Sequence, residues 1–254
     1  MASLSCKGGW GQLLTSNGPA LSGHHDDVPK GPRLVAIEGG RGRGGERHEC
    51  EEPRRVTGYE RFVKPMIDRT VGTVLLLAVL PTLLLVALAV RALLGRSVIF
   101  KQRRVGRGGR PFTMYKFRTM HADRRGARLP HAPDRRVTHK HPRDPRLTPL
   151  GRFLRKWSLD ELPQLWNVAR GDMSLIGPRP ELMDIVDRYE SWQHERHAVK
   201  PGLTGLWQVL ARGDGPMHEN THLDLAYVRR VRFTTDCKIL LHTIPALLGR
   251  RTGF

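Results

Sequence analysis

The chain has 254 residues and a formal net charge of +19, from 43 lysines and arginines against 24 aspartates and glutamates. This length suits one domain of ordinary size with tails, and the positive excess favours a polyanionic partner such as anionic lipid, nucleic acid or a phosphorylated substrate. Three cysteines without a C-x-x-C pair argue against both a disulfide framework and a structural zinc site.

Residues 1–56 predict a disordered tail. They are rich in glycine, proline, histidine and charge, and their one aromatic side chain is Trp10, so they cannot bury enough apolar surface to fold alone. The first residues lack the long apolar core of a cleavable signal peptide. We therefore expect the bulk of the chain to stay in the cytoplasm.

Residues 57–95 predict an interfacial segment followed by a bent membrane helix. The run 70–90 carries no charge, and as a helix its 21 residues would be roughly 30 Å long, enough to cross the core of a bilayer. Lysines and arginines flank the run on both sides, although such residues favour the cytoplasmic side of a membrane. Because Pro81 kinks a helix near its centre, we expect a re-entrant helix that leaves by the face it entered. A conventional single span is the alternative.

Between residues 91 and 125 the chain is strongly basic and contains a predicted strand. Residues 111–120, PFTMYKFRTM, alternate so that two sets of side chains face opposite ways. One set is Thr113, Tyr115 and Phe117, and the other is Met114, Lys116 and Arg118. Lys116 and Arg118 are candidates to bind phosphate, and attraction of the basic stretch to anionic lipid headgroups is an equally good, compatible interpretation.

The remaining residues predict a mostly helical domain. A polar loop covers residues 121–147, a helical region extends from about 150 to 200, and a turn at 200–205 precedes a strand or buried element at 206–210. Residues 236–251 have helical apolar spacing and suit a helix on the core or on the membrane. The expected fold is α/β: a small, mostly helical domain over residues 96–254 with a short strand element, anchored by the re-entrant helix and by interfacial amphipathic helices.

Asp160 and Glu161 are adjacent acids in a segment that is otherwise apolar or basic. Pro163 is best tolerated in the first turn of a helix, so both acids are expected just before or at the N-terminus of the helix that contains Leu165. The partial positive charge of that terminus keeps carboxylates ionised and attracts phosphate. The pair is either a functional acid pair or part of a capping box, since Ser158 and Glu161 have the S-x-x-E spacing.

Arg179 lies between Pro178 and Pro180. Two fixed φ angles make this loop stiff, and a rigidly presented guanidinium suits bidentate binding of phosphate. The other interpretation is a plain proline-rich turn with an exposed arginine. The chain has no P-loop and no G-x-S-x-G motif, although a lone carboxylate nucleophile would leave no such signature.

Several long segments resemble the bacterial sugar transferases, the monotopic phosphoglycosyl transferases that begin the assembly of lipid-linked glycans. The resemblance covers about residues 61–254 and rests on the bent membrane helix and on five segments in the family's order. These are VIFKQRRVGRGGRPFTMYKFRTM, LRKWSLDELPQLWNVARGDMSLIGPRPEL, KPGLTGLWQV, LDLAYV and DCKILLHTIPALL.

The resemblance implies a reaction and a set of site residues. The family transfers a sugar 1-phosphate from a nucleoside diphosphate sugar to a polyprenol phosphate, uses Mg²⁺ and releases the nucleoside monophosphate. Asp160 stands where the family has its nucleophile, which forms a phosphosugar-aspartyl intermediate, and Glu161 where it has a group associated with the metal. Arg179 corresponds to an arginine associated with phosphate, and Asp224 and Asp236 correspond to two acids linked to the site.

The resemblance also implies partners and a location. We expect a UDP-sugar, undecaprenyl phosphate and anionic membrane lipid as partners, no nucleic acid, and leave a homodimer open. The expected location is the cytoplasmic face of a bacterial inner membrane, with catalysis in residues 96–254 and a role in starting exopolysaccharide, capsule or O-antigen-type glycans. Two segments depart from the family: Leu80-Pro81 replaces the usual Ser-Pro at the break of the membrane helix, and residues 211–225 replace a Gly-Arg-Asn-type sequence.

Simple chemistry agrees with the implied role of Asp160. An unperturbed aspartate has a pKa near 4, so this carboxylate is expected to be ionised at pH 7 and to need no base. Its difficulty is the approach to an anionic diphosphate, which Mg²⁺ and basic side chains would offset. The competing hypothesis is a membrane-tethered basic binding protein without catalytic activity.

Overall fold

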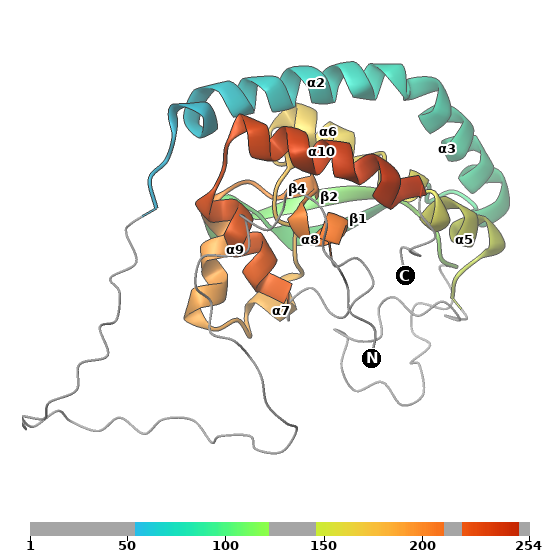
Figure 1. The fold of residues 1–254 in the computed structure, drawn as a ribbon. Helices are drawn as coiled ribbons and strands as arrows, with labels where there is room; N and C mark the ends of the chain where they lie inside the picture. Colours follow the sequence, from blue (N-terminus) through green and yellow to red (C-terminus); the bar gives the residue numbers. More distant parts are fainter. Residues whose placement is uncertain (1–53, 122–145, 211–219, 249–254) are drawn as a thin grey trace, which may run out of the picture. The chain divides into compact units, whose positions relative to one another are not determined.

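The computed structural model describes residues 54–121, 146–210 and 220–248 (Figure 1). The predicted tail at 1–56 and the predicted polar loop at 121–147 lie almost entirely outside these ranges. Residues Val56–Phe254 form one compact unit. The α-helices described are α2 (Lys64–Ala78), α3 (Leu80–Leu94), α5 (Pro149–Lys156), α6 (Gln164–Arg170), α7 (Met183–Val186), α8 (Leu206–Leu210), α9 (Thr221–Arg229) and α10 (Phe233–Leu248).

Short strands and turns connect these helices. The strands are β1 (Ile99–Val105), β2 (Pro111–Phe117), β3 (Ser174–Ile176) and β4 (Gly202–Thr204). A π-helical turn, η1 (Tyr59–Val63), precedes α2, and the 3₁₀ segments are η2 (Arg107–Gly109), η3 (Leu159–Glu161) and η4 (Ser191–Ala198). The prediction of a mostly helical α/β fold with short strands is confirmed.

The uncharged run forms two helices instead of one. Helices α2 and α3 meet at Val79, where φ and ψ are −89° and 1°, and the bent pair turns by 59°. Pro81 has no backbone N–H and its ring crowds the preceding turn, so the break lies just before it. Within the described ranges no single helix is long and apolar enough to cross a bilayer, whereas this bent pair passes that test of length and composition. The predicted break is confirmed; a re-entrant path through a membrane stays a prediction.

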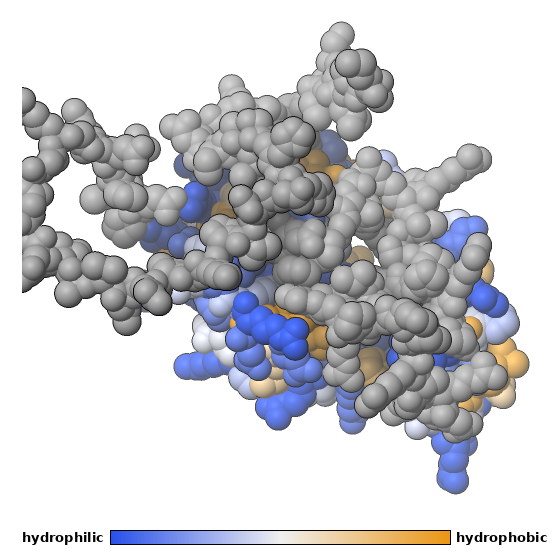
Figure 2. Space-filling model, turned by 90° about the horizontal axis from the view of Figure 1, so that it is seen from below, coloured by the Kyte–Doolittle hydropathy of each residue, from blue (hydrophilic) through white to orange (hydrophobic). Residues whose placement is uncertain are grey.

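One side of the bent pair packs on the protein and the other is exposed. A Cβ atom on Gly72 would lie 2.7 Å from Cγ1 of Val168, so glycine permits the close approach of α2 to α6. In Figure 1 the pair arches over α6 and then bends down beside α5. Its exposed large apolar residues are Met66, Val71, Val74, Leu75, Leu77, Leu80, Leu84, Leu85, Leu88 and Leu93. The face seen from below in Figure 2 shows both hydrophilic and hydrophobic residues where described residues are visible.

The predicted strand is confirmed as β2, which pairs with β1 in an antiparallel hairpin with Ile99 opposite Phe117. Both faces of β2 contribute to the core. Met114 packs in a cluster with Val168, and Phe117 packs in another cluster with Leu154. The hairpin is therefore held between α6 on one side and α5 on the other.

The prediction of a turn at 200–205 is wrong, because residues 202–204 form one strand of a second, parallel pair. Strand β4 lies beside β3, with Ser174 opposite Gly202 and Ile176 opposite Thr204. A Cβ on Gly202 would lie 2.1 Å from the backbone nitrogen of Gly177, so glycine is required by close approach of two backbones and not by a turn. The buried element that follows is the helix α8, so the alternative of a strand at 206–210 is wrong.

A buried polar network ties α2 to strand β3 and to α10. Asp68 accepts hydrogen bonds from Ser174 Oγ at 2.7 Å and from the backbone N–H of Leu175 at 3.2 Å. Lys64 Nζ lies 3.6 Å from the Asp68 carboxylate and 2.7 Å from that of Asp236. Because β3 leads directly into the loop that contains Arg179, this network anchors one end of that loop.

Asp68→Ala should lower the free energy of unfolding by about 2–4 kcal/mol, because it leaves buried donors on β3 without an acceptor and removes one of two acids beside Lys64. Chemical unfolding followed by circular dichroism would measure the change. The matched control is Asp187→Ala, since Asp187 is exposed and its replacement should change stability by less than about 0.5 kcal/mol. Equal effects of the two substitutions would contradict the anchoring role of Asp68.

Candidate active site

Asp160 and Glu161 lie in the 3₁₀ turn η3, between α5 and α6. Ser158 precedes the turn in the left-handed region, with φ of 55° and ψ of 19°, and this ends α5 abruptly. Pro163 is the N-cap of α6, so the expectation that both acids precede this helix is confirmed. The capping box is wrong: Ser158 makes no side-chain capping bond to the turn, and the Glu161 side chain binds elsewhere.

Glu161 brings two of the predicted phosphate-binding residues together. Lys116 Nζ, from β2, donates to Glu161 Oε1 at 2.9 Å. The guanidinium of Arg179 donates to both carboxylate oxygens, from Nη2 to Oε1 and from Nη1 to Oε2. Burial alone would raise the pKa of Glu161, but the charges and hydrogen bonds of Arg179 and Lys116 outweigh it and lower this pKa well below its usual value.

Asp160 has the opposite electrostatic setting. Its side chain is buried, and burial together with the negative charge of Glu161 raises the pKa of Asp160 above the ordinary aspartate value. The charges of Lys116, Arg155 and Arg179 oppose this shift. Two adjacent carboxylates are thus pushed to different pKa values, which is typical of sites where one acid reacts and the other orients.

Arg155 is a site residue that the sequence analysis missed. It lies on α5, its Nε donates to Thr119 Oγ1 at 3.1 Å, and its charge acts on Asp160. The available signal was weak, because Arg155 is one of two adjacent basic residues in LRKWSLDEL. Arg118 was predicted to bind phosphate, but it makes no hydrogen bond to Glu161. It is buried just after β2, and one of its guanidinium nitrogens lies 3.9 Å from the position that a Cβ atom on Gly95 would occupy.

Asp224 reaches the site indirectly. On α9 it accepts a hydrogen bond at 2.5 Å from Arg196, and Arg196 donates to the backbone carbonyl of Arg179 at 2.8 Å. Burial raises the pKa of Asp224 to about 6, against the opposing charge of Arg196. Asp224 therefore lies one side chain away from the predicted phosphate-binding arginine.

Asp236 lies in the anchoring network of α2 and not beside Glu161. Its carboxylate accepts hydrogen bonds from Tyr59 Oη at 2.6 Å, Lys64 Nζ at 2.7 Å and Tyr227 Oη at 2.8 Å. The same Tyr227 hydroxyl, which has one proton to share between two acceptors, also lies 3.0 Å from the backbone carbonyl oxygen of Ile176, at the end of β3. Asp236 thus supports the strand that leads to the Arg179 loop.

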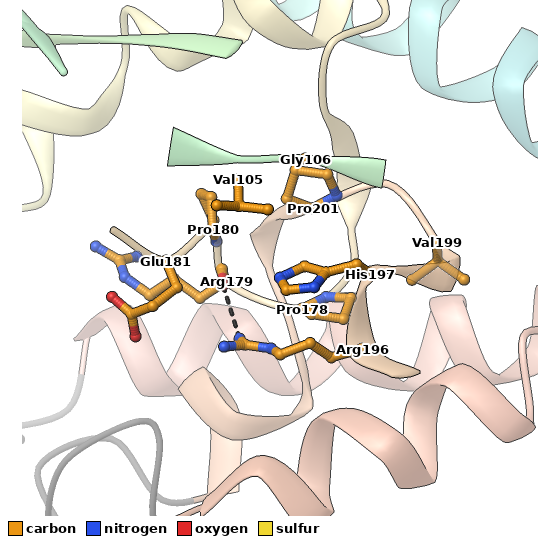
Figure 3. Close-up of a pocket in the computed structure, with 10 residues that line it drawn as sticks. All are labelled: Val105, Gly106, Pro178, Arg179, Pro180, Glu181, Arg196, His197, Val199 and Pro201. Carbon is orange, nitrogen blue, oxygen red and sulfur yellow. Dashed lines mark hydrogen bonds between the residues drawn. The ribbon is translucent and has the colours of Figure 1, made fainter. Parts of the chain in front are cut away.

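A small cavity lies beside the Arg179 loop (Figure 3). Arg196 lies along one side of it, with its guanidinium on the carbonyl oxygen of Arg179. The lining residues are Val105, Gly106, Pro178, Arg179, Pro180, Glu181, Arg196, His197, Val199 and Pro201. These residues come from the first hairpin, the Arg179 loop, η4 and the segment before β4.

His197 should make the protein less stable as the pH falls from about 6.5 to 4. Burial, with the nearby charges of Arg196 and His194, lowers the pKa of His197 to about 4. Since the unfolded chain takes up the proton near pH 6.5 and the folded chain does not, the stabilisation present above pH 6.5 is lost on acidification. Urea unfolding at pH 7 and pH 5 should show a smaller loss for His197→Gln than for the original protein. An identical loss would contradict the assignment of a neutral His197.

Comparisons with known proteins show the family of the chain. Residues 59–250 match the family described as bacterial sugar transferase. The chain is 42% identical over 187 residues to EpsL of Bacillus subtilis, an uncharacterized sugar transferase, covering 74% of this chain and 88% of that protein. It is 38% identical over 213 residues to the exopolysaccharide production protein ExoY of Rhizobium meliloti, covering 80% and 93%.

A longer relative shares the same region. The chain is 38% identical over 205 residues to the UDP-glucose:undecaprenyl-phosphate glucose-1-phosphate transferase of Xanthomonas campestris, but the match covers 77% of this chain and only 41% of that protein. The chain thus spans most of some relatives and less than half of others. Because the family match extends over most of the chain, this protein belongs to the bacterial sugar transferases and is an enzyme of the transferase class.

Proposed function

We propose that this protein transfers a sugar 1-phosphate from a UDP-sugar to undecaprenyl phosphate, with release of UMP, as the initiating step of exopolysaccharide, capsule or O-antigen-type glycan assembly. The observation that carries the proposal is the meeting of Lys116 and Arg179 on Glu161, next to the buried Asp160. The substrate class is supported by the name of the Xanthomonas campestris relative.

The proposed chemistry has two displacements at one phosphorus. A carboxylate oxygen of Asp160 attacks the phosphorus that bears the sugar, the bond from that phosphorus to the bridging oxygen breaks, and UMP leaves. A phosphate oxygen of undecaprenyl phosphate then attacks the same phosphorus, and the bond to Asp160 breaks, which restores the carboxylate. Each step brings an anion toward a phosphate, so nearby cations are required.

Arg179 and Lys116 supply such cations from the chain itself. Both bind Glu161, and a diphosphate offers them acceptors of the same kind with more negative charge. The guanidinium suits bidentate binding of phosphate, whereas the ammonium acts as a compact charge. Burial lowers the pKa of Lys116, and the charge of Glu161 opposes this shift.

Mg²⁺ is the proposed cofactor, and the carboxylates present fit it. The described residues contain no cluster of three or more acidic, histidine or cysteine ligands, but Mg²⁺ is usually bound by one or two carboxylates together with substrate phosphates and water. Glu161 would hold the ion with the diphosphate, beside Asp160, whose pKa is raised by burial and by the negative charge of Glu161. Bound there, Mg²⁺ would neutralise charge on the leaving phosphate.

We also propose a monotopic location on the cytoplasmic face of a bacterial inner membrane, beside anionic lipid. The bent pair of helices, its exposed leucines and valines and its basic flanks support this location. A single cysteine introduced near residue 60, and in a separate variant near residue 100, should react with a thiol reagent only when the reagent is added on the cytoplasmic side. Labelling from opposite sides would reject the re-entrant path and favour a single span.

Turnover decides between the enzyme and a basic binding protein without catalytic activity. The purified full chain, in lipid nanodiscs, should release UMP from at least one member of a panel of UDP-sugars. Release over multiple turnovers should require both undecaprenyl phosphate and Mg²⁺. Tight, salt-sensitive nucleic-acid binding without UMP release would favour the binding protein instead.

A further inference from the structure

Four consecutive carbonyl oxygens in the Arg179 loop, from Pro178 to Glu181, each accept a hydrogen bond, although the loop lies outside regular helix and strand. Loops of this kind usually leave some carbonyls to water. Here the donors come from several different elements. They are the N–H of Gly202 at 2.8 Å, Arg196 Nη2 at 2.8 Å, Arg104 Nη1 at 3.2 Å and the N–H of Val105 at 3.0 Å.

Two of these donors are arginine side chains that hold adjacent carbonyls from different sides. Arg196, from η4, binds the carbonyl of Arg179, and Arg104, from β1, binds that of Pro180. Arg196 is only 2% exposed, and its charge is balanced by Asp224 at 2.5 Å. Arg104 lies 3.4 Å from the carboxylate of Glu181. Each buried cation therefore has its own acid: Asp224 on α9 for Arg196, and Glu181 at the end of the loop itself for Arg104.

We propose that Arg196 and Arg104 are positioning residues that clamp the backbone of Arg179 and keep its guanidinium directed at Glu161. Prolines fix φ at 178 and 180, and a residue before proline is restricted to extended backbone. The freedom that remains is rotation of the peptide planes on either side of Arg179. Donors fixed to the carbonyls of Arg179 and Pro180 remove that freedom.

The forked shape of the guanidinium explains why Arg196 suits this role. Its Nη2 reaches both the carbonyl of Arg179 and the carboxylate of Asp224, while Nη1 donates to the hydroxyl of Tyr189. A lysine in its place would keep the positive charge and the pairing with Asp224, but one ammonium cannot reach all three acceptors in the same geometry. Arg196→Lys therefore separates geometry from charge.

The kinetic part of this inference rests on the proposed function. Arg196→Lys and Arg104→Lys should each lower kcat for UMP release by about 10- to 100-fold with a smaller change in KM for the UDP-sugar, because a displaced cation acts mainly on the transition state. In the background of Arg179→Ala, each should have less than about a twofold further effect, because the group being positioned is gone. The matched control is Arg229→Lys, since Arg229 is half exposed on α9 and should show full activity.

Hydrogen exchange tests the clamp without any substrate. The backbone N–H groups of Gly202 and Val105 donate to the loop carbonyls of Pro178 and Glu181. Both should exchange faster in Arg196→Lys and Arg104→Lys than in the original protein or in Arg229→Lys. Unchanged exchange in both variants would overturn the clamp. The positioning role would be overturned if exchange became faster but the losses of kcat in the Arg179→Ala background were as large as those in the original protein. If the original protein turned over no UDP-sugar, the proposed function would fail while exchange still decided the clamp.

Discussion

Asp160→Asn should abolish multiple turnover, with a loss of at least about 10³-fold in UMP release, because an amide oxygen cannot form the phosphosugar intermediate. In the original protein, a donor labelled in its sugar phosphate and supplied without undecaprenyl phosphate should leave a covalent adduct on the peptide that contains Asp160. That adduct should be missing from the variant. Tandem mass spectrometry after rapid acid quenching would measure both.

The variant is expected to fold, so that unfolding can be excluded as the cause of any loss of UMP release. Burial raises the pKa of Asp160 and so disfavours its charged form, and a neutral amide of the same shape avoids that cost. Thermal unfolding should show no loss of stability. Asp187→Asn, at an exposed position, serves as the control for loss of a negative charge. Substantial turnover by Asp160→Asn would reject the covalent route through this residue.

Glu161→Gln should lower kcat/KM by about 10²- to 10³-fold and raise the Mg²⁺ concentration needed for half-maximal rate. The amide keeps the shape of the side chain but removes the charge that pairs Lys116 and Arg179. Repulsion between the two cations then acts without a counterion, and the metal loses its proposed carboxylate. Initial rates at several Mg²⁺ concentrations would separate the two effects.

A loss of stability of about 2–3 kcal/mol is expected for the same variant, because hydrogen bonds to a charged acceptor are lost in a largely buried place. Rates should therefore be measured well below its unfolding temperature. Glu161→Asp keeps the charge on a shorter side chain and should recover part of the Mg²⁺ dependence. An unchanged requirement for Mg²⁺ in Glu161→Gln would show that this carboxylate does not hold the metal.

The parts of the fold that could be predicted from sequence depend on local chemistry. Pro81 lacks a donor wherever it lies in a helix, so the break between α2 and α3 follows from one residue and an uncharged run. The alternation in residues 111–120 predicted β2, and Pro163 placed both acids ahead of α6. Each of these signals acts within a few residues along the chain.

The predictions from sequence that were wrong concern residues whose partners lie far away along the chain. Glycines at 202 and 205 suggested a turn, but the reason for Gly202 is the backbone of Gly177, 25 positions earlier. The S-x-x-E spacing suggested a cap for Glu161, but charges from Lys116 and Arg179 offered that carboxylate stronger partners. A long-range ion pair outweighed a local hydrogen bond.

The sequence by itself determined the family, the bent apolar helix and the identity of the acid pair, because motif order, the absence of charge and the position of prolines can all be seen along the chain. The tertiary structure alone decided which cations meet Glu161, that Arg196 joins Asp224 to the Arg179 loop, and that Asp236 belongs to the network of α2. Arg196 carries no local pattern, and its role depends on an acid on α9 and a carbonyl in the Arg179 loop. Contacts of that kind are set by the packing of segments that are far apart in sequence, which no spacing rule encodes.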